Sequence, residues 1–237
     1  MVREEKLKLA KKNEFELNLK VGNDNGNSEH DIVLNGEMIK QPNVFSKINQ
    51  IPNLEEMDKA NFIKNIHDNL IVSVQSKAVN DGVPSTYFIS TYAMKSGKNL
   101  RTIEVGAFNS KLNSDVPFIN TPGQIAGYAV KKMFEQGKDF SEINVIADMT
   151  TALPVAQYSK DNSTTFSNRF MENEFDVTVH VPNGEYKVHI NFEYVKTLPE
   201  SVPAVFYLQN SKDANEIFAI VNKEYEQLFK ENKIKKS

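Results

Sequence analysis

The strongest constraint on the fold is a run of alternating apolar residues from 175 to 195, interrupted by Asn183-Gly184. Strict alternation is typical of a strand with one buried face, and Asn-Gly is a strong signal for a two-residue hairpin turn. We therefore predict a hairpin in which every apolar residue lies opposite another apolar residue. The predicted pairs are Val181 with Tyr186, Val179 with Val188, Val177 with Ile190, and Phe175 with Phe192.

A second set of alternating residues lies near the start of the chain. Apolar residues at 15, 17, 19 and 21 predict a first strand, and the polar residues 22–28 predict a turn. A second strand resumes at Ile32, and Asn35-Gly36 predicts a tight turn into a third strand. Before these strands, residues 1–14 are predicted to form a charged N-terminal extension.

The middle of the chain combines helical and strand-like patterns. Thr121 and Pro122 predict the start of a helix, since threonine is a good N-cap and proline is favoured at the first helical position. The short apolar run 143–147 predicts a strand buried on both faces. A helix followed by such a strand indicates a mixed α/β domain.

Two further segments complete the expected architecture. Strand-like runs over 70–75, 86–94 and 100–108 predict a small β-rich subdomain over 42–117. Apolar residues at helical spacing predict a last amphipathic helix over 214–231.

Composition narrows the classes of function. The 237 residues include no cysteine, which excludes disulfides, thiolate metal sites and cysteine nucleophiles. A formal net charge of -3 provides no global field for nucleic acid or anionic lipid, so we expect neither direct nucleic-acid binding nor membrane binding. No apolar run approaches the ~20 residues of a membrane span. The charged start lacks the apolar stretch of a secretory signal, and a cytoplasmic location is expected.

Three segments are candidates for chemistry. In the turn Asp24 to Ser28, consecutive backbone N–H groups can form a concavity for an anion, and Gly26 lets the backbone approach a phosphate. Asp24 could hold Mg²⁺ through water. Ordinary hairpin turns prefer the same residue types. Downstream, Glu200 could orient an attacking water or simply cap a helix, and 150–158 indicates a strand end, a loop and a helix start.

Taken in order, these segments resemble the N-terminal half of bacterial actin-like proteins, in particular the plasmid-segregation ParM branch. The turn is similar to the first phosphate loop of the actin superfamily. The run from Asn120 to Asp148 resembles the helix and strand that follow the inserted subdomain. Leu153 to Tyr158 is similar to a Leu-Pro-x-x-x-Tyr segment, and 195–204 is close to the Pro-Glu-Ser-x-Pro-Ala stretch. The likeness covers about residues 15–210.

The resemblance implies an RNase H-like α/β fold, first half of an actin-type ATPase. In this scheme 15–41 and 118–237 form the core, and 42–117 form the inserted subdomain. Asp24 would lie near the Mg²⁺ of bound ATP or GTP, and Asn25, Gly26, Asn27 and Ser28 would face the phosphates. Glu200 matches the residue that polarises the attacking water. The implied function is nucleotide-driven polymerisation in plasmid or DNA segregation, with self-association into filaments and a DNA-bound adaptor protein as partners.

Two departures from the family pattern lead to alternatives. Many actins carry a lysine shortly after the turn, where this chain has Glu29-His30-Asp31, and two carboxylates there would repel phosphate unless they point away. The sequence also lacks the second phosphate loop, so we expect hydrolysis in a full-length protein and little activity from this chain alone. The alternative function is a half-actin that binds filaments or another partner without hydrolysis. A relative of sugar kinases or Hsp70-type chaperones is a third alternative, which the Pro-Glu-Ser-x-Pro-Ala stretch argues against.

Overall fold

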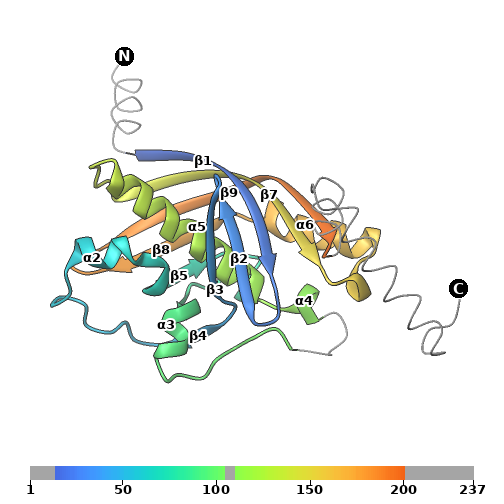
Figure 1. Ribbon diagram of the computed structural model, residues 1–237, viewed down its shortest axis with the longest axis horizontal. Helices are drawn as coiled ribbons and strands as arrows, with labels where there is room; N and C mark the ends of the chain where they lie inside the picture. Colours follow the sequence, from blue (N-terminus) through green and yellow to red (C-terminus); the bar gives the residue numbers. More distant parts are fainter. Residues whose placement is uncertain (1–13, 105–109, 201–237) are drawn as a thin grey trace, which may run out of the picture. The chain divides into compact units, whose positions relative to one another are not determined.

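Nine strands form one mixed sheet in the computed structural model, which describes residues 14–104 and 110–200 (Figure 1). The chain divides into two compact units, residues 1–198 and 199–237, and the sheet and its helices belong to the first. The strand order is β3-β2-β1-β7-β9-β8-β5-β6-β4. The strands are β1 (Glu14–Asn25), β2 (Glu29–Leu34), β3 (Glu37–Pro42), β4 (Phe45–Ile48), β5 (Ile71–Gln75), β6 (Ser85–Ile89), β7 (Glu142–Leu153), β8 (Phe175–Val181) and β9 (Gly184–Pro199).

The predicted meander at the start of the chain is confirmed by the antiparallel pairs β1–β2 and β2–β3. Asn35 and Gly36 both have positive φ, 47° and 90°, as a two-residue hairpin turn of this kind requires. Strand β1 runs to Asn25, beyond the predicted end at residue 21. The alternation continues there with Asn23 and Asn25 pointing inward, so the pattern of buried positions persists although the residues are polar. The turn is thereby reduced to residues 26–28.

Strand β7 lies parallel to β1, with Leu19 opposite Ala147 and Asn23 opposite Thr151. The expectation of a short strand buried on both faces is wrong. β7 has 12 residues, and buried and more exposed positions alternate along most of its length. Its outward residues include Ile146, which is 41% exposed. One face of this part of the sheet therefore carries the core.

The hairpin of β8 and β9 forms, but the predicted register is wrong by two residues. Val181 pairs with Gly184, and Val179 pairs with Tyr186. The turn consists of Pro182 and Asn183, and Asn183 has a φ of 58°. Proline cannot donate a hydrogen bond to the ladder, while asparagine tolerates the left-handed region. A shift of two residues keeps every side chain on its face, so apolar residues still meet.

Helix α5 (Val116–Glu135) packs against the sheet (Figure 1). It begins before the predicted cap, so Thr121 and Pro122 lie inside the helix and the predicted start is wrong. The true first turn contains Pro117, which satisfies the same preference for proline. A Cβ on Gly127 would lie 2.8 Å from Leu70 Cδ2, which shows how closely the helix approaches the residue just before β5.

The segment 42–117 extends the same sheet. The strand predicted over 70–75 is confirmed as β5, and β4 was not predicted. The run 86–94 is strand only to Ile89, and 100–108 contains one isolated bridge at Arg101 before the residues outside the description. The helical elements here are α2 (Lys59–Lys64), η2 (Ile66–Asp68), η3 (Asn80–Gly82), α3 (Ser90–Lys95) and α4 (Ser110–Asn113). The subdomain boundaries stay a prediction.

Four phenylalanines connect the later elements on the core face. Phe118 of α5 lies 4.4 Å from Phe170 in α6 (Lys160–Met171), measured between ring centroids. Phe170 in turn contacts Phe175 of β8 and Phe192 of β9. These ring contacts bury aromatic area between α5, α6 and the strands β8 and β9.

The charged extension 1–14 lies almost wholly outside the described residues, and the predicted helix 214–231 lies outside them completely. Within the described ranges, no helix has the length and apolar character needed to cross a bilayer.

Candidate functional site

A cluster of buried polar side chains lies beneath the turn between β1 and β2. Asn23 and Asn25 point inward from the carboxyl end of β1 and are 4% and 0% exposed. Asn23 Nδ2 donates to Asn25 Oδ1 at 2.8 Å and to Thr151 Oγ1 of the neighbouring β7 at 3.2 Å. Thr121 Oγ1 of α5 donates to Asn25 Oδ1 at 3.0 Å. The carboxyl ends of parallel strands are where open α/β sheets bind ligands.

Asn43, just after β3, fixes the backbone of the turn. Its N–H donates to Ser28 O at 2.9 Å, and its Nδ2 donates to Gly26 O at 2.7 Å. Asn120 Nδ2 holds Asn43 from below through a 2.9 Å bond to Oδ1. The carbonyl oxygens of Gly26 and Ser28 thus both accept hydrogen bonds from Asn43.

The N–H groups of the same turn, unlike these carbonyl groups, have no hydrogen-bond partner among the described residues. Those of Gly26, Asn27 and Ser28 donate to no other group in the described part of the chain. A Cβ on Gly26 would lie 3.0 Å from Glu29 O, so a side chain there would strain the hairpin. A close-packed turn whose carbonyls are held while its N–H groups have no internal partner has the chemistry of an anion cradle. The side chain of Asn25 is buried in the network, so any contact of Asn25 with an anion would come from its backbone.

His30 closes the network beneath the turn. Its Nε2 donates to Asn23 Oδ1 at 2.7 Å, and its ring is completely buried. Burial, followed by the positive charge of Lys111, lowers the pKa of His30 to about 3. His30 is therefore neutral at physiological pH and supplies no charge to an anion. Its Nδ1 has no hydrogen-bond partner within the described residues.

The carboxylates near the turn differ in their surroundings. Asp31 Oδ2 accepts a 3.0 Å hydrogen bond from Lys40 Nζ, which compensates its charge. Glu29 is exposed. The Asp24 side chain is 63% exposed at the end of β1, where a carboxylate can contact a hydrated Mg²⁺ through water. In the described ranges, no group of three or more histidines and carboxylates is arranged to hold a metal ion directly.

Lys111 is the site residue that sequence reasoning missed. It belongs to α4, its side chain is 1% exposed, and its Nζ lies 4.0 Å from Asp24 Oδ1. Nothing in the run Ser110 to Asn113 indicates a functional lysine. Only the fold brings this segment to the turn.

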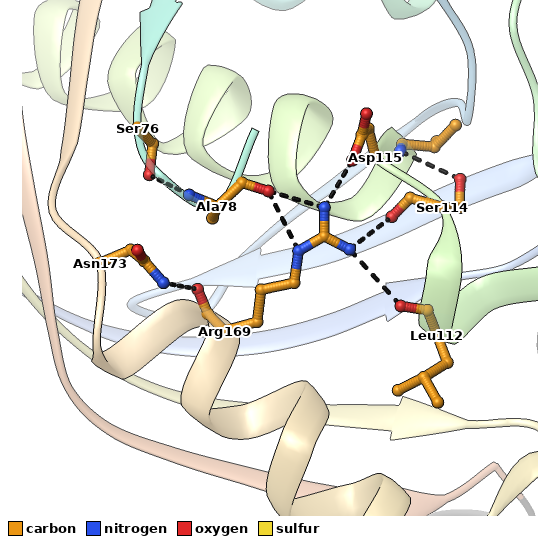
Figure 2. Close-up of polar contacts among 8 residues, drawn as sticks. Ser76, Ala78, Leu112, Ser114, Asp115, Arg169 and Asn173 are labelled. Atoms are coloured by element: carbon orange, nitrogen blue, oxygen red, sulfur yellow. Dashed lines mark hydrogen bonds and ion pairs between the residues drawn. The ribbon is translucent and has the colours of Figure 1, made fainter. Parts of the chain in front are cut away.

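Hydrogen bonds at both ends of α4 fix the position of Lys111. Its N–H donates to Gln157 Oε1 at 3.2 Å. Figure 2 shows the other end, where the Arg169 guanidinium of α6 contacts the carbonyl groups of Leu112 and Ser114 and the carboxylate of Asp115. The same guanidinium also donates to Ala78 O.

Glu200 follows directly after β9, in a turn, and its side chain is exposed. It belongs to the second compact unit, whereas the turn and its polar network belong to the first. The roles assigned to Asp24, to residues 25–28 and to Glu200 remain predictions.

The neutral state of His30 predicts a pH dependence of stability. Its folded pKa of about 3 lies below the usual 6.5, so the unfolded chain takes up a proton first as the pH falls. This histidine should therefore reduce the free energy of unfolding below pH 6.5, by up to about 1.4 kcal/mol per pH unit. The free energy of unfolding, measured with urea between pH 6.5 and 5.0, should fall less steeply with decreasing pH in His30→Gln than in the wild-type protein. Glutamine keeps a donor for Asn23. The same pH dependence of the free energy of unfolding in both proteins would contradict a neutral His30.

No family model and no curated protein matches the sequence. Several solved structures share the fold. The actin-like protein Alp7A has a TM-score of 0.61 and 18% identity, over 84% of this chain and 49% of that one. ParM of Bacillus thuringiensis, in its apo form, has a TM-score of 0.54 and 18% identity, over 85% and 49%. The archaeal actin homologue Ta0583 has a TM-score of 0.50 and 19% identity, over 81% and 49%.

The chain thus spans about half the length of the solved structures that it matches. These likenesses confirm the expected actin-type α/β architecture, and they agree with the expectation of one half of a ParM-like protein. The described chain has the actin-like fold.

Proposed function

We propose that this chain is the phosphate-binding half of an actin-like, filament-forming ATPase. The observation that carries the proposal is the turn 26–28, whose carbonyl groups are held by Asn43 and whose N–H groups have no internal partner among the described residues. This turn lies at the carboxyl end of parallel strands in an actin-like fold. A nucleotide phosphate is the anion that such a cradle suits.

The residues around the turn have separate tasks in this proposal. The backbone N–H groups of Gly26, Asn27 and Ser28 bind phosphate oxygens, and Asn25 holds the turn from below through its buried amide. Asp24 orients the water shell of Mg²⁺. When bound, the ion neutralises charge that develops on the phosphates. The proposal covers both ATP and GTP, since none of the residues in the turn contacts the base in this scheme.

Glu200 is proposed as the residue that positions the attacking water. Its carboxylate would accept a hydrogen bond from the water and turn an oxygen lone pair toward the terminal phosphorus. The proposal for Glu200 rests on the Pro-Glu-Ser-x-Pro-Ala resemblance.

The wider role that we propose is plasmid or DNA segregation in the cytoplasm. Polymerisation driven by nucleotide binding would supply the movement, and a DNA-bound adaptor protein would connect the filament to its cargo. The support is the likeness of the sequence segments to the segregation actins and the structural likeness to ParM.

The exposed carboxylate of Glu29, directly after the turn, favours a second candidate function, because it would repel a bound phosphate. A half-actin that binds filaments or another partner without hydrolysis would need only the fold. Nucleotide turnover by the full-length protein distinguishes the two functions.

The cradle predicts that a single methyl group at residue 26 weakens nucleotide binding. In Gly26→Ala the new Cβ meets Glu29 O at 3.0 Å, so the turn or β2 must shift. We expect the Kd for Mg-ATP of the full-length protein to rise about tenfold, which corresponds to about 1.4 kcal/mol. Gly184→Ala is the control, because a Cβ there meets nothing within 4 Å. Equal affinities in both variants would remove the turn from the site.

Removal of the Glu200 carboxylate should separate binding from hydrolysis. In Glu200→Ala, we expect phosphate release by the full-length protein to slow about 100-fold or more, since a positioned base contributes on that scale. The Kd for Mg-ATP should change little. Glu193→Ala, which removes an exposed carboxylate from β9, is the control and should keep wild-type turnover. Wild-type turnover in Glu200→Ala would show that the assignment is wrong.

A further inference from the structure

We infer that Lys111 is the cationic ligand for the nucleotide phosphates at the turn between β1 and β2. This inference rests on the proposed function and deepens it, because it names the residue that supplies positive charge to the cradle. Lys111 comes from α4, far from the turn in sequence.

Lys111 lies next to the turn. The Lys111 side chain is 1% exposed, and Nζ lies 4.0 Å from Asp24 Oδ1 at the end of β1. Its charge also acts on His30 beneath the turn, whose pKa it lowers in addition to the effect of burial. Lys111 Nζ therefore lies beside the exposed Asp24, next to the turn.

The other ionisable groups around the turn leave its negative charge uncompensated when phosphate binds. Asp24 and Glu29 place exposed carboxylates at the two ends of the turn, and Asp31 is engaged with Lys40 on the strands. His30 is neutral and contributes no positive charge. A triphosphate brings several negative charges to this corner. An ammonium group at the turn compensates them, and a lysine binds phosphate as a point charge.

The position of Lys111 is fixed before any ligand binds. A long flexible lysine loses side-chain entropy when it binds a ligand, and this loss is smaller when the side chain is already ordered. Lys111 is almost completely buried, and its backbone is held by Gln157 on one side. Arg169 holds the carbonyl groups of Leu112 and Ser114 on the other. The contacts of Arg169 in Figure 2 thus keep the C-terminal end of α4 in place.

The test is Mg-ATP binding by the full-length protein, measured by calorimetry for wild type, Lys111→Met and Lys20→Met. Lys111→Met keeps the length and apolar stem of the side chain and removes the charge. Lys20→Met removes an exposed lysine from β1, which pairs with Asp148, and controls for the loss of one positive charge. We expect at least a tenfold rise in Kd for Lys111→Met and less than a twofold change for Lys20→Met. Thermal melting establishes that each variant is folded.

The outcomes separate this inference from the function on which it rests. Wild-type binding together with unchanged affinity in Lys111→Met would overturn the role of Lys111 and leave the cradle standing. A wild-type protein that does not bind Mg-ATP would overturn both. If Lys111→Met does not fold, ¹⁵N-lysine spectra of the wild-type protein decide the question. The Lys111 ammonium signal should shift when Mg-ATP is added, and an unchanged signal at saturation would contradict the inference.

Discussion

The corner between β1 and β2 depends on amide-to-amide hydrogen bonds buried beneath the turn. Asn43 is central, because it binds the turn through its backbone and its side chain while Asn120 of α5 holds it from below. Buried polar groups of this kind are costly unless they are satisfied, and a connected set has few alternative arrangements. The network therefore fixes the conformation of the turn and connects it to α5 and β7.

The same network explains which parts of the fold the sequence could predict. Alternation of apolar residues predicted the meander and the hairpin near the C-terminal end of the described chain. The pattern failed where inward positions are polar, so the predicted end of β1 fell before Asn23 and Asn25. The pattern also failed in the β8–β9 hairpin, where two registers bury the same faces of the strands. There Pro182 determines which residues form the turn. The predicted cap at Thr121 failed because that hydroxyl serves the buried network inside a longer helix.

The candidate site was predictable only in part, because its charge comes from elsewhere in the chain. The residue types of the turn pointed to an anion, and the roles assigned to Asp24 and residues 25–28 stay predictions. The sequence suggested that the run Glu29-His30-Asp31 would repel phosphate. In the structure, Asp31 is paired with Lys40, and His30 is a neutral part of the buried network beneath the turn. Lys111 approaches from α4, and no local pattern marks it. The placement depends on tertiary contacts of Gln157 and Arg169, which a single sequence does not display.

Hydrogen exchange at the turn is the most direct test of the central claim that its N–H groups bind phosphate. The measurement follows the backbone amides of Gly26, Asn27 and Ser28 in the full-length protein, with and without saturating Mg-ATP. If these groups donate to phosphate oxygens, their exchange should slow markedly when the nucleotide binds, while the amides of the exposed Asn35-Gly36 turn should be unaffected. Unchanged exchange at residues 26–28 in the nucleotide-bound protein would contradict the claim.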